Sequence, residues 1–319
     1  MLLFVSCSAL AKDSFEQLEN LFEKWRAFEL APLYKNAPDY RKTTFEARHA
    51  QWAQFKQQLL SLDYSQWTLP QQIDWFVMLA ELNGYEFNEQ VLKPWERDPA
   101  FYKQVWTYKS DVPAHEGPTP HYVTELWTYS FPLSASEQER LISDLSRIAP
   151  LQAQAKGNLT GNARELWVAG IRDIVEQYDV LKSISADIKA SNNKQLIEVH
   201  EQAMTSSFEF AAWLHEQSPK KTAPSGLGKA NYQWYQQHVH LVPMSWKDEV
   251  RLLERELDRA WYSLKLEEQR NQDLPQLVAV KNQEEYEALA ERSADYFLKF
   301  LEKTTLSFYQ CQMNVHLKN

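Results

Sequence analysis

Hydrophobic residues recur at spacings of three and four along most of the chain, the repeat of an α-helix with one face on a core. The first such stretch follows Ser14, whose side chain is suited to cap a helix with Gln17 three positions later. Its apolar positions are Phe15, Leu18, Leu21, Phe22, Trp25 and Phe28. The pattern predicts an amphipathic helix that begins at the Ser14 cap.

Two more helices are predicted before residue 90. The second helix has apolar positions at Phe45, Trp52, Phe55, Leu59 and Leu62. The third helix is entered through Thr68, with Pro70 in its first turn, where a proline is tolerated. Its predicted buried face consists of Ile73, Phe76, Leu79 and Leu82.

Helical patterns resume after residue 132. Two of these helices are expected to open with a capping box, formed by Ser134 with Glu137 and by Asn162 with Glu165. Further helices are predicted over 193–217 and 283–303. The most regular pattern follows Ser245-x-x-Asp248 and should end near Asn271. The side chains of this helix that we expect to be buried are Val250, Leu253, Leu257, Ala260, Trp261 and Leu264.

The stretch 93–132 interrupts the helical pattern. It contains six prolines, which break helices, and many aromatic residues, which need a surface to pack on. One interpretation is a groove in which clustered Trp and Tyr residues, such as Trp106 and Trp127, bind a sugar or a peptide. The other is an ordered connection that packs on the helices. The sequence leaves both open.

Composition supports an all-α fold built as an array of long amphipathic helices. Among 319 residues there are only 7 glycines but 12 Trp, 15 Tyr and 15 Phe, so turn-rich β architectures are disfavoured. Residues 12–305 are expected to form a single helical domain, with a subdivision near 218–228, and 306–319 an atypical tail. The net charge of −9, without basic blocks, makes nucleic acid an unexpected partner.

The first eleven residues, "MLLFVSCSALA", are an apolar run that precedes the charged, periodic sequence. Ala9-Leu10-Ala11 has the form of a signal-peptidase site, which predicts an exported protein. A competing interpretation takes residues 4–7 as a lipobox with acylation of Cys7, which would anchor the protein at the bacterial envelope. A third is a short buried strand. The run is too short to span a bilayer.

Metal motifs are incomplete in this sequence. Three His-Glu pairs begin an H-E-x-x-H motif, but none has the second histidine, and we interpret them as surface or capping pairs. These pairs are His115-Glu116, His200-Glu201 and His215-Glu216. His238 and His240 would share a metal on a strand, whereas on a helix they diverge by about 200°. Helical spacing favours a helix that ends near His240, so we predict no metal site here and identify no catalytic residue by motif.

Three segments carry a resemblance to a known family. They are "WERDPAFY" at 95–102, "GLGKANYQWYQQHVHLVPMSWKDEVRLLERELDRAW" at 226–261 and "EEQRNQDLP" at 267–275. In order and spacing they resemble the bacterial group catalogued as "domain of unknown function 885", over about residues 15–303. The resemblance implies an exported or lipid-anchored helical protein similar to zinc metallopeptidases, whose histidine and glutamate ligands lie in a later helical half.

Members of that group are longer, and the ending "TTLSFYQCQMNVHLKN" departs from their pattern. We therefore expect only the N-terminal portion of such a protein, without a zinc ligand or cofactor of its own and inactive alone. By position in the family pattern, Lys229, Tyr232 or His238 would contact a peptide substrate, although Tyr232 and Trp234 also suit core packing. The alternative is a non-enzymatic periplasmic protein that binds peptides or glycans or acts as a scaffold.

Overall fold

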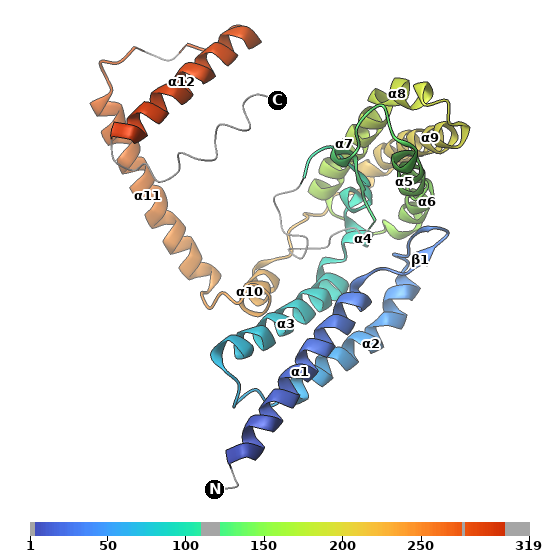
Figure 1. Ribbon diagram of the computed structural model, residues 1–319, viewed down its shortest axis with the longest axis vertical. Coiled ribbons are helices and arrows are strands. Elements are labelled where there is room, and N and C mark those ends of the chain that lie inside the picture. The colour runs from blue at the N-terminus through green and yellow to red at the C-terminus, as the bar shows by residue number, and fades with distance from the viewer. Residues whose placement is uncertain (1–3, 110–121, 276–277, 304–319) are drawn as a thin grey trace. The chain divides into compact units, whose positions relative to one another are not determined.

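The computed structural model describes residues 4–109, 122–275 and 278–303 (Figure 1), with side chains except at 4–14 and 302. Helices account for most of these residues, and the strands form two short two-stranded pairs. The predicted all-α fold is confirmed. Contacts divide the chain into two compact units, Met1–Arg251 and Leu252–Asn319.

The first three helices pack against one another: α1 (Phe4–Glu29), α2 (Lys42–Ser61) and α3 (Leu69–Phe87). Their shared core is built from Leu18, Leu21, Trp25, Trp52, Leu59, Trp67, Trp75, Met78 and Leu82. The predicted start of α1 at Ser14 is wrong, because the helix begins ten residues earlier. The intervening stretch contains neither Gly nor Pro, the residues that most disfavour a helix. A buried strand at this position is therefore also wrong.

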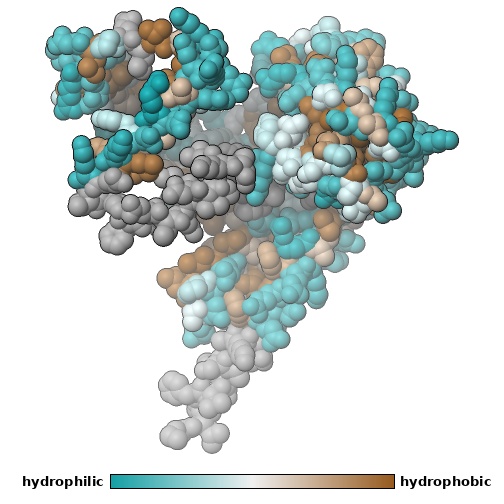
Figure 2. Space-filling view, turned by 45° about the horizontal axis from the view of Figure 1, so that its top comes forward, coloured by the Kyte–Doolittle hydropathy of each residue, from teal (hydrophilic) through white to brown (hydrophobic). Residues whose placement is uncertain are grey.

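Helix α3 begins as predicted, with the capping box of Thr68 and Gln71 and a proline in its first turn. Its buried face agrees with the expected one only in part: Leu82 is buried and Leu79 half-buried. Trp75 and Met78 are buried in place of Ile73 and Phe76, which are exposed. Trp75, Met78 and Leu82 follow helical spacing and pack with residues of α1 and α2, so the contact with these helices decides which side chains are buried. Figure 2 shows hydrophobic residues at the surface of this three-helix bundle.

A tight hairpin follows α1, with strands β1 (Leu33–Tyr34) and β2 (Ala37–Pro38) paired antiparallel. Lys35 and Asn36 both have positive φ values of 51° and 67°, the conformation that a two-residue hairpin turn requires. Asn36 Nδ2 donates to Ser146 Oγ at 2.8 Å. The hairpin is thereby tied to the residue that follows a later helix, α5 (Ala135–Leu145).

The proline-rich stretch forms short elements. They are a π-helix η1 (Asn88–Leu92), α4 (Pro94–Arg97), η2 (Pro99–Tyr102), a parallel pair β3 (Val105–Trp106) and β4 (Thr124–Glu125), and η3 (Leu126–Thr128). Trp95, Phe101 and Tyr102 are buried. The interpretation as an ordered connection is confirmed for these residues. Trp106 is half-buried and Trp127 exposed.

Five helices form a second group in the same unit: α5 (Ala135–Leu145), α6 (Ile148–Asn158), α7 (Arg164–Ser183), α8 (Ser185–Ala190) and α9 (Lys194–Gln217). Helix α9 packs on each of the other four. The capping box at Ser134 and Glu137 is confirmed, and Asn193 caps α9. Gly170 on α7 lies against Pro99 and Ala100, where a Cβ would come within 2.7 Å of both residues.

The capping box expected at Asn162 and Glu165 is wrong. Asn162 Oδ1 accepts from the backbone N–H groups of Thr222 and Ala223, and Glu165 Oε2 accepts from that of Ser225. Both side chains hold the loop that follows the short helix η4 (Ser218–Lys220). Side chains that can cap a helix can also accept hydrogen bonds from turns, and here they accept from the N–H groups of the loop.

The remaining helices are α10 (Lys229–His238), α11 (Trp246–Arg270) and α12 (Gln283–Lys303), and their bounds agree with the prediction within two residues. The division between the units falls within α11. The apolar side chains of α11 from Val250 to Leu264 (the α11 stripe) were expected to be buried, and this prediction is wrong: Leu253 is 66% exposed and Trp261 53%. No helix of the described ranges has the length and hydropathy to cross a membrane.

Candidate functional site

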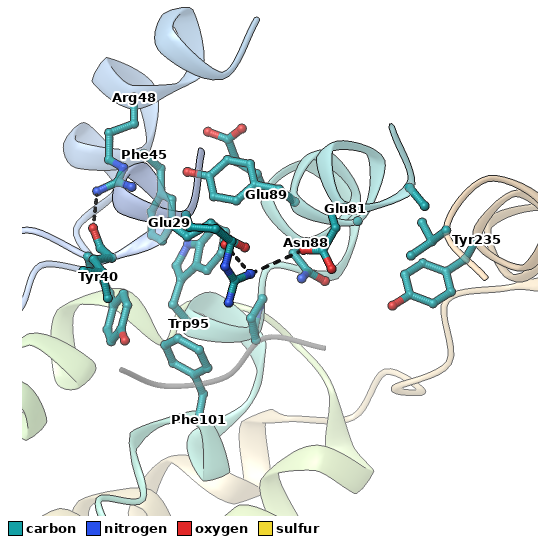
Figure 3. Close-up of a pocket in the computed structure, with 18 of the residues that line it drawn as sticks. Glu29, Tyr40, Phe45, Arg48, Glu81, Asn88, Glu89, Trp95, Phe101 and Tyr235 are labelled. Atoms are coloured by element: carbon teal, nitrogen blue, oxygen red, sulfur yellow. Dashed lines mark hydrogen bonds and ion pairs between the residues drawn. The ribbon is translucent and has the colours of Figure 1, made fainter. Parts of the chain in front are cut away.

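A cleft of about 630 Å³ lies in the first unit (Figure 3). The ends of α1 and α3 form one side of it, with side chains from α2 and from the residues just before and after the β1–β2 hairpin. Elements α4 and η2 contribute aromatic side chains, and α10 with the residues after it completes the lining. The cleft therefore gathers segments that are up to 215 positions apart, from Arg26 to Leu241.

The charged end of the cleft comes from facing positions of α1 and α3. Arg26 and Glu29 are three residues apart on α1, which places them on one helix face. Arg26 Nη1 lies 2.6 Å from Glu29 Oε2 and 3.7 Å from Glu81 Oε2 of α3. One guanidinium thus faces two carboxylates. The side chains of Glu29 and Glu81 are only 23% and 19% exposed.

Burial raises the pKa of Glu29 from 4.5 to about 7. The guanidinium of Arg26 acts in the opposite direction, and the negative charge of Glu81 raises the pKa further. Near neutral pH, the side chain of Glu29 is therefore partly protonated, whereas most carboxyl groups are fully ionised at this pH.

We predict that Glu29→Gln changes stability in a pH-dependent way. The pKa of Glu29 is higher in the folded chain, so stability is highest below pH 4.5 and is lost as pH rises toward about 7. An ionised carboxylate at this buried position lowers the stability of the folded chain by about 2 kcal/mol above pH 7, after allowance for its partial exposure. Glutamine cannot ionise and therefore removes this loss. Urea unfolding should show Glu29→Gln as the more stable chain at pH 8 and nearly equal at pH 5.

The exposed residue Glu19 lies on the same helix and supplies the matched control. Glu19→Gln should show no gain at pH 8, because its side chain is already in water. Equal stability of Glu29→Gln and the natural chain at both pH values would contradict a raised pKa.

Further polar groups fix the end of α1 and line the cleft. Arg48 donates to the backbone carbonyls of Phe28 and Leu30, which have no partner within the helix. Burial raises the pKa of Tyr85, against the lowering influence of Arg48. Glu89 is buried, and its Oε2 lies 2.8 Å from Nδ1 of His49. The carboxylate of Glu89 thus has a partner of its own.

The opposite side of the cleft is aromatic. Phe45 of α2 stacks on Trp95 of α4 with ring centroids 3.6 Å apart, and Tyr40 meets Phe101 of η2 edge-on at 4.7 Å. Tyr40, Trp95 and Phe101 are each less than 9% exposed. Because their neighbours hold these rings in place, they form a preformed apolar wall.

Helix α10 is held against α3 by three kinds of contact. Asn83 Nδ2 donates to the carbonyl of His238 at 3.0 Å, and the rings of Phe87 and Trp234 are stacked at 5.7 Å. Gly84 leaves room for Val239, whose Cγ1 would lie 3.3 Å from an added Cβ. These contacts bring Tyr235 and Val239 to the cleft.

The three residues predicted to contact substrate do not line the cleft. Lys229 Nζ lies over the ring of Trp246, Tyr232 donates its hydroxyl to Glu249, and His238 stacks on Trp234. Neighbouring positions of the same segment line it instead. A role for Lys229, Tyr232 and His238 in binding stays a prediction, and so does acylation of Cys7, whose side chain lies outside the described residues.

Histidines in the described ranges have separate partners. His238 lies against Trp234, whereas His240 follows the helix and meets the ring of Tyr235. His200 is buried, with Nε2 2.7 Å from the carbonyl of Leu181 in the last turn of α7, so it is not a surface residue. His115-Glu116 lies outside the described residues. No three His, Cys, Asp or Glu side chains of the described ranges are grouped to hold a metal ion.

Comparison with known proteins gave no relative. No protein-family model, curated protein or solved structure matches the chain. The site is therefore interpreted from its own geometry.

Sequence reasoning missed the charged end of the cleft because Arg26, Glu29 and Glu81 look like residues of solvated helix faces. One signal was present: Glu81, Tyr85 and Asn88 follow the i, i+4, i+7 spacing of one helix face. Polar residues that repeat in this way near the end of an apolar helix indicate a face turned toward a cleft.

Proposed function

We propose that the chain binds peptides in this cleft, as the substrate-holding portion of an exported protein similar to zinc metallopeptidases. The observation that carries the proposal is the lining of the cleft, with a fixed aromatic wall facing a charged and polar wall. Its volume of about 630 Å³ is typical of ligand sites. A peptide offers apolar side chains to one wall and polar backbone groups to the other.

The position of α10 links the cleft to the family resemblance. The segment 226–243, which carries much of the resemblance, includes α10 and the cleft residues Tyr235, Val239 and Leu241. In the family interpretation this segment contacts peptide substrate. The cleft offers a physical place for that contact, formed by neighbours of the residues expected from the pattern.

The zinc expected for a longer family member does not fit the described residues, which contain no suitable group of ligands. The proposal therefore assigns binding to this chain and derives no catalytic step. Export and a lipid anchor at Cys7 belong to the proposal and rest on the sequence of residues 1–11. The alternative is a non-enzymatic periplasmic protein for which the same aromatic wall binds a peptide or glycan.

The test is to block the cleft and measure retention of peptides. Val77 lines the cleft and is 48% exposed, so Val77→Trp adds bulk to the cleft without disturbing the core. Ile73 lies one turn earlier on α3, is 51% exposed and does not line the cleft, which makes Ile73→Trp the matched control. Equilibrium dialysis against a synthetic pool of random pentapeptides, read by mass spectrometry, should show about tenfold weaker retention for Val77→Trp only.

If Val77→Trp and Ile73→Trp retained the peptide pool equally well, the peptides would bind outside the cleft. That result would overturn the proposal. A pool of oligosaccharides is dialysed in parallel. Retention of sugars and not of peptides, lost in Val77→Trp, would favour the glycan-binding alternative.

A further inference from the structure

We propose that the charged end of the cleft binds a primary ammonium group of the peptide, held by Glu29, Glu81 and the side-chain oxygen of Asn88. The inference rests on the proposed function and specifies the chemistry that the ligand presents. Its sources in a peptide are a free amino terminus and a lysine side chain.

Charge is unevenly balanced in this cleft. Most ionic groups that line the cleft have partners of their own. Asp39 accepts from the guanidinium of Arg41, Glu89 from His49, and Arg48 is bound to backbone carbonyls. At the remaining position two carboxylates face the single guanidinium of Arg26. With Glu29 ionised, this end of the cleft has one negative charge in excess and no spare cation for an anion. A bound cation would favour that ionised form of Glu29.

The side chain of Asn88 carries a buried acceptor without a donor in the described ranges. Oδ1 of Asn88 is shielded from solvent, and among the described residues no group donates a hydrogen bond to it. Asn88 lies two turns after Glu81, and Figure 3 shows its amide beside the Glu81 side chain. A buried acceptor without a donor costs free energy. Asn88 lines the cleft, and a turn of its amide toward the cleft would let a ligand donor recover that cost.

Geometry and chemistry agree on an ammonium group. It carries three N–H donors and no acceptor, and the site offers three acceptors: two carboxylates and one amide oxygen. The low exposure of Glu29 and Glu81 strengthens the attraction, because water screens the charges less. Arg26, with a side chain 48% exposed, has space to turn toward solvent when the ligand enters.

The aromatic side chains of Trp95 and Phe101 line the same cleft as this end (Figure 3). The rings of Trp95 and Phe101 suit an apolar side chain close to the ammonium group. We therefore expect preference for peptides that present an amino group next to an apolar residue. An isolated cation, without the apolar contact, should bind more weakly.

The experiment uses the full chain and three pools of random pentapeptides made without arginine. The first pool has free amino termini and no lysine, the second has acetylated termini and one lysine, and the third has acetylated termini and no lysine. We expect retention of the first pool, the second pool or both to exceed that of the third about tenfold or more, as for a charge-assisted hydrogen bond. The first two pools show which amine the site takes.

Glu81→Gln supplies the second arm, since it keeps the shape of the side chain and removes its charge. The retention advantage of amine-bearing pools should fall about tenfold in this variant. Glu86→Gln is the matched control, because Glu86 lies on α3, pairs with Lys56 and does not line the cleft. It should bind like the natural chain.

The outcomes separate the two proposals. Equal retention of all three pools, lost in Val77→Trp, would keep peptide binding and overturn the role of the ammonium group. No retention of any pool would overturn both. An amine preference that survives in Glu81→Gln would place the ammonium group elsewhere and also overturn the inference. The comparison of pools uses the natural chain, so it does not depend on the folding of a variant.

Discussion

Trp25→Ala is expected to lower the free energy of unfolding by about 3 to 5 kcal/mol, the range for deletion of a large buried aromatic side chain. Trp25 is fully buried in the core of α1, α2 and α3. Its ring contacts Phe28, Phe55 and Tyr85 at centroid distances of 5.2 to 5.7 Å. The alanine would leave a cavity that these rings fill only in part.

Urea unfolding monitored by circular dichroism measures this change. Trp127 is 36% exposed, and Trp127→Ala is the matched control with an expected loss clearly smaller than that of Trp25→Ala. Since Tyr85 lines the cleft, Trp25→Ala should also weaken peptide retention. A loss below about 1 kcal/mol for Trp25→Ala would mean that the three helices do not share the core described above.

Gln177→Leu is expected to cost about 2 to 6 kcal/mol, because two buried backbone N–H groups lose their acceptor at about 1 to 3 kcal/mol each. Gln177 is fully buried on α7. Its Oε1 accepts from the N–H groups of Gln104 and Val105 at 2.5 and 3.1 Å, and its Nε2 donates to Ser207. Leucine keeps the bulk and removes every hydrogen bond.

Gln202 is exposed on α9, so Gln202→Leu is the matched control and should change the free energy of unfolding by about 0.5 kcal/mol or less. Urea unfolding of both variants tests the prediction. If Gln177→Leu were as stable as Gln202→Leu, the stretch around Gln104 would not depend on α7 for its position.

The sequence predicted most helices because their signals are local. A capping box, as at Ser134 and Glu137, and a proline in the first turn, as at Pro70, act within a few residues. The orientation of a helix depends on distant residues, which explains the error on α3. There two apolar sets compete for the core, and only the neighbouring helices decide between Trp75 and Ile73.

The cleft was less predictable than the helices. Its charged end joins Arg26 and Glu29 of α1 to Glu81 of α3, and nothing local to either segment indicates that they meet. The aromatic stretch was recognised in the sequence, but Trp95 and Phe101 reach the cleft, whereas Trp106 and Trp127 do not. The α11 stripe shows the converse: regular spacing indicates an apolar face and does not supply a partner for it.

The length of α1 bears on where the cleft could operate. The helix is continuous from Phe4 to Glu29, and at 1.5 Å per residue Cys7 lies about 33 Å along its axis from Glu29. That distance is several times the depth of one headgroup layer, about 5 to 8 Å on each side of the hydrocarbon core. With a lipid attached at Cys7, α1 would act as a rigid spacer that holds the cleft clear of the lipid headgroups, open to peptides that diffuse in the surrounding water.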